Sequence, residues 1–191
     1  MPRISAVVAR STVAVAALAS LAIAPAAGAA LPSNRDRTIV PGASIGGVKL
    51  GYGARRAVAT WGPSQCAQAT DLLCHYEASP SSANFNTGNT AFQLTGGKVT
   101  GVSITSAYDF DRNRNRVPIL GGALTKYRTA GGIGLGATVA QLRRAYPAIR
   151  GRTYGGGVAA GYTLGRGARA TAFDFAVVNG TLRLFAIRIG R

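Results

Sequence analysis

An internal duplication is the feature that most constrains how this chain can fold. Residues 47–51 (GVKLG) precede a stretch at 54–61, and 85 positions later residues 132–136 (GIGLG) precede a similar stretch at 139–146. In both stretches the apolar residues recur with the spacing of one helix face. Each stretch ends at a breaker, Gly62-Pro63 or Pro147, so we predict two short helices in equivalent positions.

Turn signals and caps support the same arrangement. Thr138 and Gln141 have the spacing of a capping box at the start of the second helix. Alternating apolar runs flank Gly96-Gly97 and Asn179-Gly180, which predicts an antiparallel hairpin after each helix. A further strand is expected at His75-Tyr76 and another at Gly161-Tyr162.

The predicted fold class is α+β, with two tandem copies of a short helix packed on an antiparallel sheet of about three to four strands. Copies this small bury little surface alone, so we expect them to pack together. They would lie back to back, or form one extended sheet that carries both helices on one side. The expected segments are a signal peptide (1–30), an N-terminal linker (31–44), repeat 1 (45–107), a basic linker (108–130) and repeat 2 (131–191).

Two copies of a Leu-Gly entry and a short helix, with a two-cysteine loop in the first copy and a terminal hairpin, resemble a known repeat. Residues 45–106 and 131–190 are similar to the repeat of the secreted beta-lactamase inhibitor protein and of the small lipoprotein of the outer-membrane barrel assembly machinery. The chain lacks the lipid-bearing Cys of that lipoprotein, and each copy shows one helix where the inhibitor has a helical pair. The resemblance implies a fold and a binding habit, and it transfers no target.

The first thirty residues have the pattern of a secretory signal. Arg3 and Arg10 precede an uncharged apolar run at 11–24, and a small-residue cleavage site follows at 27–30. The run is shorter than the roughly 20 residues that span a bilayer. We therefore expect an exported protein, secreted or held in the periplasmic or cell-wall space, with no membrane span after cleavage.

Export makes Cys66 and Cys74 candidates for a disulfide, because both lie in one short segment outside the reducing cytosol. The alternative is a reactive thiol pair. A metal site is not expected, since only His75 stands nearby as a third ligand.

The candidate motifs for catalysis or cofactor binding each lack a residue or an arrangement that the chemistry requires. His75 is the single histidine, and as the neighbour of Cys74 on a strand it would point to the opposite face. Residues 109–115 imitate a calcium loop but have Arg114 at the turn glycine, and residues 132–136 imitate a dinucleotide loop with Val139 at the third glycine. We expect no cofactor, no metal and no enzyme activity; a hydrolase with an unrecognised site remains an alternative.

The charge is high and uneven. The chain carries a formal net charge of +16, and residues 108–191 hold fourteen basic and three acidic residues. Such an excess attracts polyanions, although 19 Arg against 3 Lys is also the usage of a GC-rich genome. The candidate anion-binding patch consists of Arg112, Arg114, Arg116, Arg128, Arg143, Arg144, Arg150 and Arg152.

The sequence thus predicts an exported, non-catalytic binding module that acts at the cell envelope or in the medium and recognises a protein partner. The alternative is a basic protein that docks on anionic envelope polymers or nucleic acid. Nucleic acid is disfavoured, because most aromatic residues fall in core patterns and do not alternate with exposed arginines.

Overall fold

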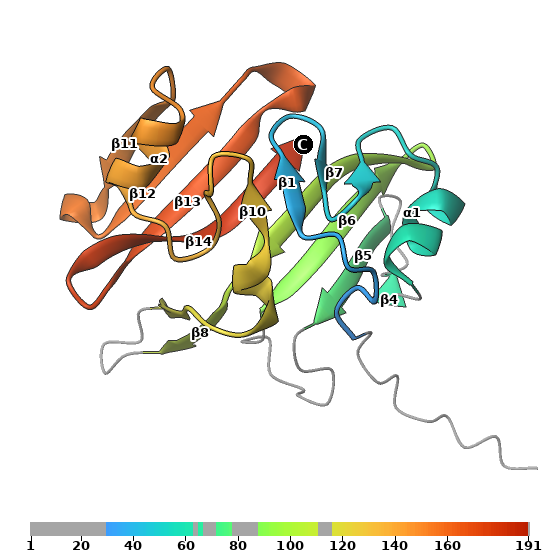
Figure 1. The fold of residues 1–191 in the computed structure, drawn as a ribbon, viewed down its shortest axis with the longest axis horizontal. Helices are drawn as coiled ribbons and strands as arrows, with labels where there is room; N and C mark the ends of the chain where they lie inside the picture. Colours follow the sequence, from blue (N-terminus) through green and yellow to red (C-terminus); the bar gives the residue numbers. More distant parts are fainter. Residues whose placement is uncertain (1–29, 63–64, 67–71, 78–87, 111–115, 191) are drawn as a thin grey trace, which may run out of the picture.

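The computed structural model describes residues 30–62, 65–66, 72–77, 88–110 and 116–190. Its main element is one antiparallel sheet of eight strands (Figure 1). The strands lie in the order β11 (Arg150–Tyr154), β12 (Ala159–Leu164), β13 (Thr171–Val178), β14 (Thr181–Gly190), β7 (Lys98–Thr105), β6 (Asn89–Thr95), β5 (Leu72–Glu77) and β4 (Gln65–Cys66).

Two smaller sheets accompany it. The first has the order β10 (Arg128–Thr129), β1 (Thr38–Val40), β2 (Ser44–Ile45) and β3 (Val48–Lys49), and β1 pairs with β10 in parallel. The second is the hairpin of β8 (Ala107–Phe110) and β9 (Arg116–Ile119). Short 3-10 turns are η1 (Ala123–Lys126), η2 (Gly155–Gly157) and η3 (Gly167–Arg169). Parts of both segments expected as linkers therefore form strands.

The first helix, α1 (Ala54–Trp61), begins and ends as the sequence predicts. Ala57 and Trp61 form its buried face, and Gly62 ends it with a φ of 95° that favours glycine. The Tyr76 hydroxyl of β5 donates to the Gly62 carbonyl at 2.6 Å. This bond fixes the end of the helix against the sheet.

The second helix, α2 (Val139–Ala145), confirms the predicted capping box. The Thr138 hydroxyl accepts from the Gln141 backbone N–H at 3.2 Å, and the Gln141 side chain accepts from the Thr138 N–H at 2.8 Å. Leu142 is the buried anchor of this helix. The hairpins at Gly96-Gly97 and Asn179-Gly180 are likewise confirmed, as β6–β7 and β13–β14.

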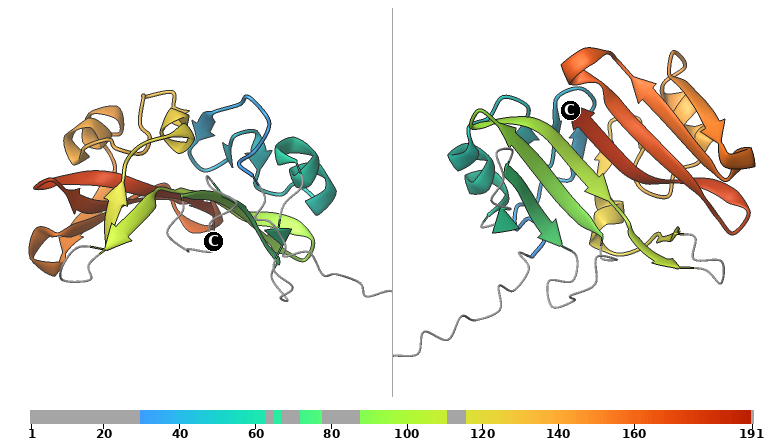
Figure 2. Two further views of the ribbon diagram at one scale, coloured as in Figure 1. Left: turned by 90° about the horizontal axis from the view of Figure 1, so that it is seen from below. Right: turned by 180° about the vertical axis from the view of Figure 1, so that it is seen from behind.

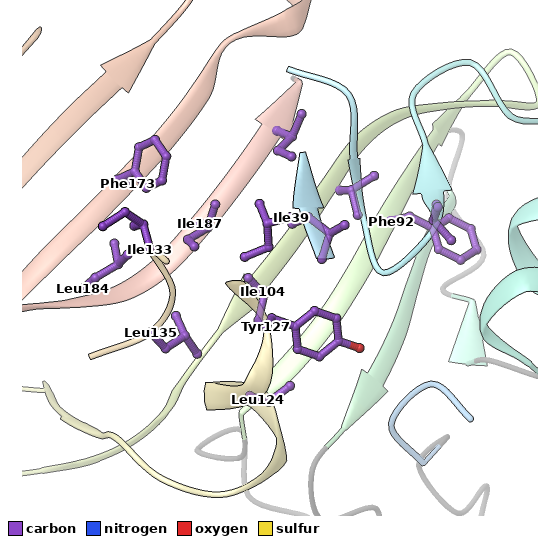
Figure 3. Packing of buried hydrophobic residues seen from close by; sticks show 14 of the residues in the cluster. Ile39, Phe92, Ile104, Leu124, Tyr127, Ile133, Leu135, Phe173, Leu184 and Ile187 are labelled. Carbon is purple, nitrogen blue, oxygen red and sulfur yellow. The ribbon is translucent and has the colours of Figure 1, made fainter. Parts of the chain in front are cut away.

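The large sheet has one covered and one open side. Both helices and the small sheet that contains β1 lie on the same side (Figure 2). Ring contacts agree, because Trp61 of α1 contacts Tyr76 and Phe92, and Tyr146 after α2 contacts Phe173. Figure 3 shows the core between the layers, where Ile39 of the small sheet lies near Ile104 and Ile187 of the large one.

The predicted fold class is wrong. The protein is mostly β, and it has one eight-stranded sheet in place of two sheets of three to four strands. The reason is the pairing of β7 with β14, in which Thr105 to Gly101 lie opposite Ala186 to Gly190. Of the two arrangements left open by the sequence, the structure has the continuous sheet with both helices on one side.

Trp61 is the largest side chain that joins a helix to the sheet, and its removal is expected to destabilise the fold. The ring is 1 % exposed, and its Nε1 donates to the Gly46 carbonyl at 2.9 Å. Trp61→Ala should lower the free energy of unfolding by about 3–5 kcal/mol through the cavity that it leaves. Urea denaturation measures this effect, with Arg55→Ala on the exposed side of α1 as the control. Equal stability of the two variants would contradict this packing.

Tyr127 gives a prediction about pH. It is buried, and its hydroxyl has no hydrogen-bond partner among the described residues. Burial raises the pKa of this hydroxyl, a shift that Arg37 opposes and Asp36 reinforces. The neutral form is thus favoured in the fold, and stability is lost as the pH rises above the unfolded value of about 10.

Tyr127→Phe should therefore match or exceed the wild-type stability at pH 7, by up to about 1 kcal/mol, since it removes an unpaired hydroxyl. Its advantage should grow above about pH 10, where only the wild type has this group to ionise. Urea denaturation at both pH values measures the difference. A variant clearly less stable at pH 7 would show that the hydroxyl is satisfied in the folded protein.

Candidate functional site

The uncovered side of the large sheet, called here the open face, is polar and built from small residues. Cross-strand register defines two of its rows, because residues that lie directly opposite one another point to the same side. One row is His75, Ala91, Ser103, Arg188, Ala172, Thr163 and Arg150. The next is Glu77, Asn89, Thr105, Ala186, Asp174, Gly161 and Arg152.

The residues between these rows point to the helices, and most of them are apolar. One such row consists of buried residues only, and Thr90 is its polar member: Tyr76, Thr90, Ile104, Ile187 and Phe173. The sheet therefore separates a packed side from a solvated one. Among the described elements, no helix or strand covers the open face (Figure 2).

A hollow of about 350 Å³ lies near the middle of the open face. Leu73, Ala91, Gly101, Ala172 and Arg188 are among the residues that line it. The hollow exists because Ala91 of β6, Gly101 of β7 and Ala172 of β13 have small side chains or none, while the longer side chains of Leu73 and Arg188 border it.

Arg188, which lines this hollow, forms an ion pair. Its guanidinium lies 2.8 Å and 3.0 Å from the Asp174 carboxylate on the adjacent strand. The Arg188 side chain is 62 % exposed and that of Asp174 is 24 % exposed. A pair this exposed adds little stability. Its effect is to orient the guanidinium on the open face.

The structure divides the predicted anion-binding patch. Arg112 and Arg114 lie outside the described residues, and Arg116 begins β9. Arg128 lies in β10, and its guanidinium donates to the Tyr127 carbonyl at 3.0 Å. The described members of this group, Arg116 and Arg128, therefore belong to two different strands.

Arg128 instead shares a second hollow with Arg183, which sequence analysis missed. This hollow of about 490 Å³ is also lined by Thr125, Gly134 and Gln141. The Arg183 guanidinium donates to the Gly136 carbonyl at 3.3 Å, where residues 136–138 lie beside the start of β14. No local pattern marks Arg183, because only this tertiary contact brings it to Arg128.

Three of the remaining predicted residues gather at one edge of the sheet. Arg143 projects from α2 onto the ring of Tyr162 in β12, while Arg150 and Arg152 belong to the edge strand β11. Arg144 is exposed on α2. The arginines that the sequence groups at the second helix and just after it thus lie at one edge of the sheet, on both of its faces.

Cys66 and Cys74 lie directly opposite each other in β4 and β5. Opposite residues in antiparallel strands have Cα atoms about 4.5–5.5 Å apart, which is the range that disulfides require. Cys74 is buried on the covered side beside Phe92. The disulfide remains a prediction that this register permits.

The acid and base candidates are not brought together. His75 in β5 and Asp174 in β13 lie four strands apart on the open face, about 19 Å by the usual strand spacing. Asp109 belongs to β8 of another sheet, and Asp111 lies outside the described residues. Among the described residues no three His, Cys, Asp or Glu are grouped as metal ligands would be.

No described helix has both the length and the apolar character needed to cross a membrane. Comparison of the chain with known protein families, with curated proteins and with solved structures found no match.

The cysteine prediction is tested by mass spectrometry of the mature protein under non-reducing conditions. We expect a mass 2 Da below that of the reduced chain and a peptide that links Cys66 to Cys74. Reduction should lower the free energy of unfolding by roughly 2–3 kcal/mol, since the bridge closes a short loop. Complete labelling by a thiol reagent in the unreduced, unfolded protein would contradict it.

Proposed function

We propose that the protein is an exported binding module without catalytic activity, and that it recognises a folded protein partner through the open face. The observation that carries this proposal is the contrast between the two sides of the large sheet. One side packs against helices and small strands, and the other presents polar and small residues with a hollow between them.

The dimensions of the open face favour a protein over a small ligand. Eight strands span about 34 Å at the usual spacing, and the six strands from β12 to β5, which have six to ten residues, extend for about 20–34 Å. A stable interface needs about 800 Å² on each partner, which this area supplies. The hollow beside Ala172 suits a single protruding side chain, the kind of anchor that dominates binding energy at protein interfaces.

Charge gives the partner a further property. Arg150, Arg152 and Arg188 point to the open face from its β11 half, while Glu77 lies at the β5 half. Complementary charges speed association and select orientation. The preferred partner therefore presents acidic groups toward the β11 half and an apolar or aromatic side chain toward the hollow.

The sequence features support the location and the class of function. The signal at residues 1–30, most of which lies outside the described residues, supports action outside the cytoplasm. The likeness of residues 45–106 and 131–190 to the repeat of the secreted beta-lactamase inhibitor protein supports recognition of a protein partner.

Docking on anionic envelope polymers is a second candidate, and one observation favours it. Between Asp111 and Asp174 the chain has eleven Arg and Lys residues and no carboxylate. Such a stretch attracts any polyanion, and its binding would weaken steeply as salt rises. This candidate predicts that total charge matters and that the shape of the open face does not.

A substitution that fills the hollow distinguishes between the two candidate functions. The mature protein is immobilised and exposed to envelope fractions and culture medium, and the affinity of each captured protein is then measured for Ala172→Trp and Ala140→Trp. Ala172 lines the hollow, and Ala140 is an exposed residue of α2. We expect Ala172→Trp to weaken a specific partner at least about tenfold, since a central anchor loses its place.

Ala140→Trp is the matched control, and it should change the affinity by less than about twofold, as surface positions outside an interface do. Thermal unfolding of both variants verifies that they remain folded. Capture that is equal for both variants and governed by salt alone would overturn recognition through the open face and favour the polyanion candidate.

A further inference from the structure

The strand β11 ends the large sheet and leaves its outer edge open. It pairs with β12 on one side, and among the described strands none pairs with its other side. All five of its residues are exposed. An edge of this kind presents backbone N–H and C=O groups that can pair with an added strand.

An arginine stacked on a tyrosine flanks this edge on the covered side of the sheet. The Arg143 guanidinium lies 5.4 Å from the centre of the Tyr162 ring, and it also donates to the Tyr162 hydroxyl at 3.3 Å. The same ring lies over Gly151 of β11, where any Cβ would collide with it. Gly151 therefore brings the ring and the stacked arginine close to the edge.

A second arginine and tyrosine flank the edge on the open face. The Arg152 guanidinium lies 4.9 Å from the centre of the Tyr154 ring. Tyr154 in turn lies over Gly161 of β12, 3.3 Å from the place where a Cβ would be. Arg150 points to the same side, because it lies two residues before Arg152 on the strand. Stacking holds these cations in place and reduces the entropy lost on binding.

These arginines are available to an outside carboxylate. The ion pair in the described residues is that of Arg188 with Asp174, which leaves Arg143, Arg150 and Arg152 without one there. A second copy of this chain is not expected to bind at this edge, because antiparallel pairing of two β11 strands would place arginines opposite arginines. The charge of the edge requires an acidic partner.

We propose that β11 is the docking edge for an acidic, extended segment of another protein, which adds to the sheet as a further strand. The register defines its pattern. Residues opposite Arg150 and Arg152 are two apart and point to the open face, so they are Asp or Glu. The residue between them lies opposite Gly151, next to the Tyr162 ring, and is apolar.

Two labelled peptides of one composition test the pattern. The first is Thr-Glu-Val-Glu-Val-Thr, and the second is Thr-Glu-Glu-Val-Val-Thr, which cannot place both carboxylates on one side of a strand. Fluorescence anisotropy at low ionic strength measures their affinity for the mature protein. We expect the alternating peptide to bind at least about fivefold more tightly, because only it pairs both arginines while it extends the sheet.

Two further comparisons test the edge itself. Two versions of the alternating peptide are N-methylated, one at the odd-numbered and one at the even-numbered backbone nitrogens. One of the two should lose its binding, since methylation removes the N–H groups that pair with the edge and keeps the charge. The double variant Arg150→Ser/Arg152→Ser should weaken the alternating peptide at least about tenfold. The control Arg166→Ser/Arg169→Ser removes the same charge at exposed positions near η3, and it should cost less than about threefold.

Equal losses for the two double variants, or equal affinity for the two peptides, would overturn the proposal and show attraction by charge alone. Insensitivity to N-methylation in both registers would overturn strand addition. Ala172→Trp should leave peptide binding unchanged, because the edge does not include the hollow. The proposal for the edge and the proposal for the open face can therefore be refuted independently.

Discussion

The antiparallel pairing of β7 with β14 is the interaction on which the rest of the structure depends. Five residue pairs, from Thr105 with Ala186 to Gly101 with Gly190, join the two halves of the chain into one sheet. Gly190 is required at the end of this pairing, because a Cβ there would collide with the Thr100 carbonyl. Without this pairing each half would leave a long strand edge exposed.

The joined sheet determines where binding surfaces can exist. Both helices and the small sheet of β1 occupy one side, so the buried aromatic side chains, such as Trp61 and Phe173, lie between them and the large sheet. The other side retains the polar and small partners of the strand alternation. One edge of the sheet ends in β11, where the chain carries no carboxylate to neutralise its arginines. One topology thus determines the open face, the free edge and where the arginines lie on them.

Local features of the fold were predictable, and the assembly was not. The capping box of Thr138 and Gln141, the end of α1 at Gly62 and the turn at Asn179-Gly180 depend on neighbours within a few residues, so the sequence marks them. The fold class was wrong because β7 pairs with β14 across more than 80 residues, and no local pattern specifies that contact. The arginine patch was predicted as one surface; of its described residues, Arg128 lines a hollow, and Arg143, Arg150 and Arg152 lie at an edge.

The sequence by itself determined the two helices, the hairpins, the excess of positive charge and the segment in which two cysteines can pair, since each depends on short-range geometry or on composition. Only the tertiary structure decided that the sheets merge, that Arg183 joins Arg128, and that Arg143 stacks on Tyr162. These contacts join residues far apart in the chain, and their free energy comes from burial and register that exist only after the whole sheet has formed.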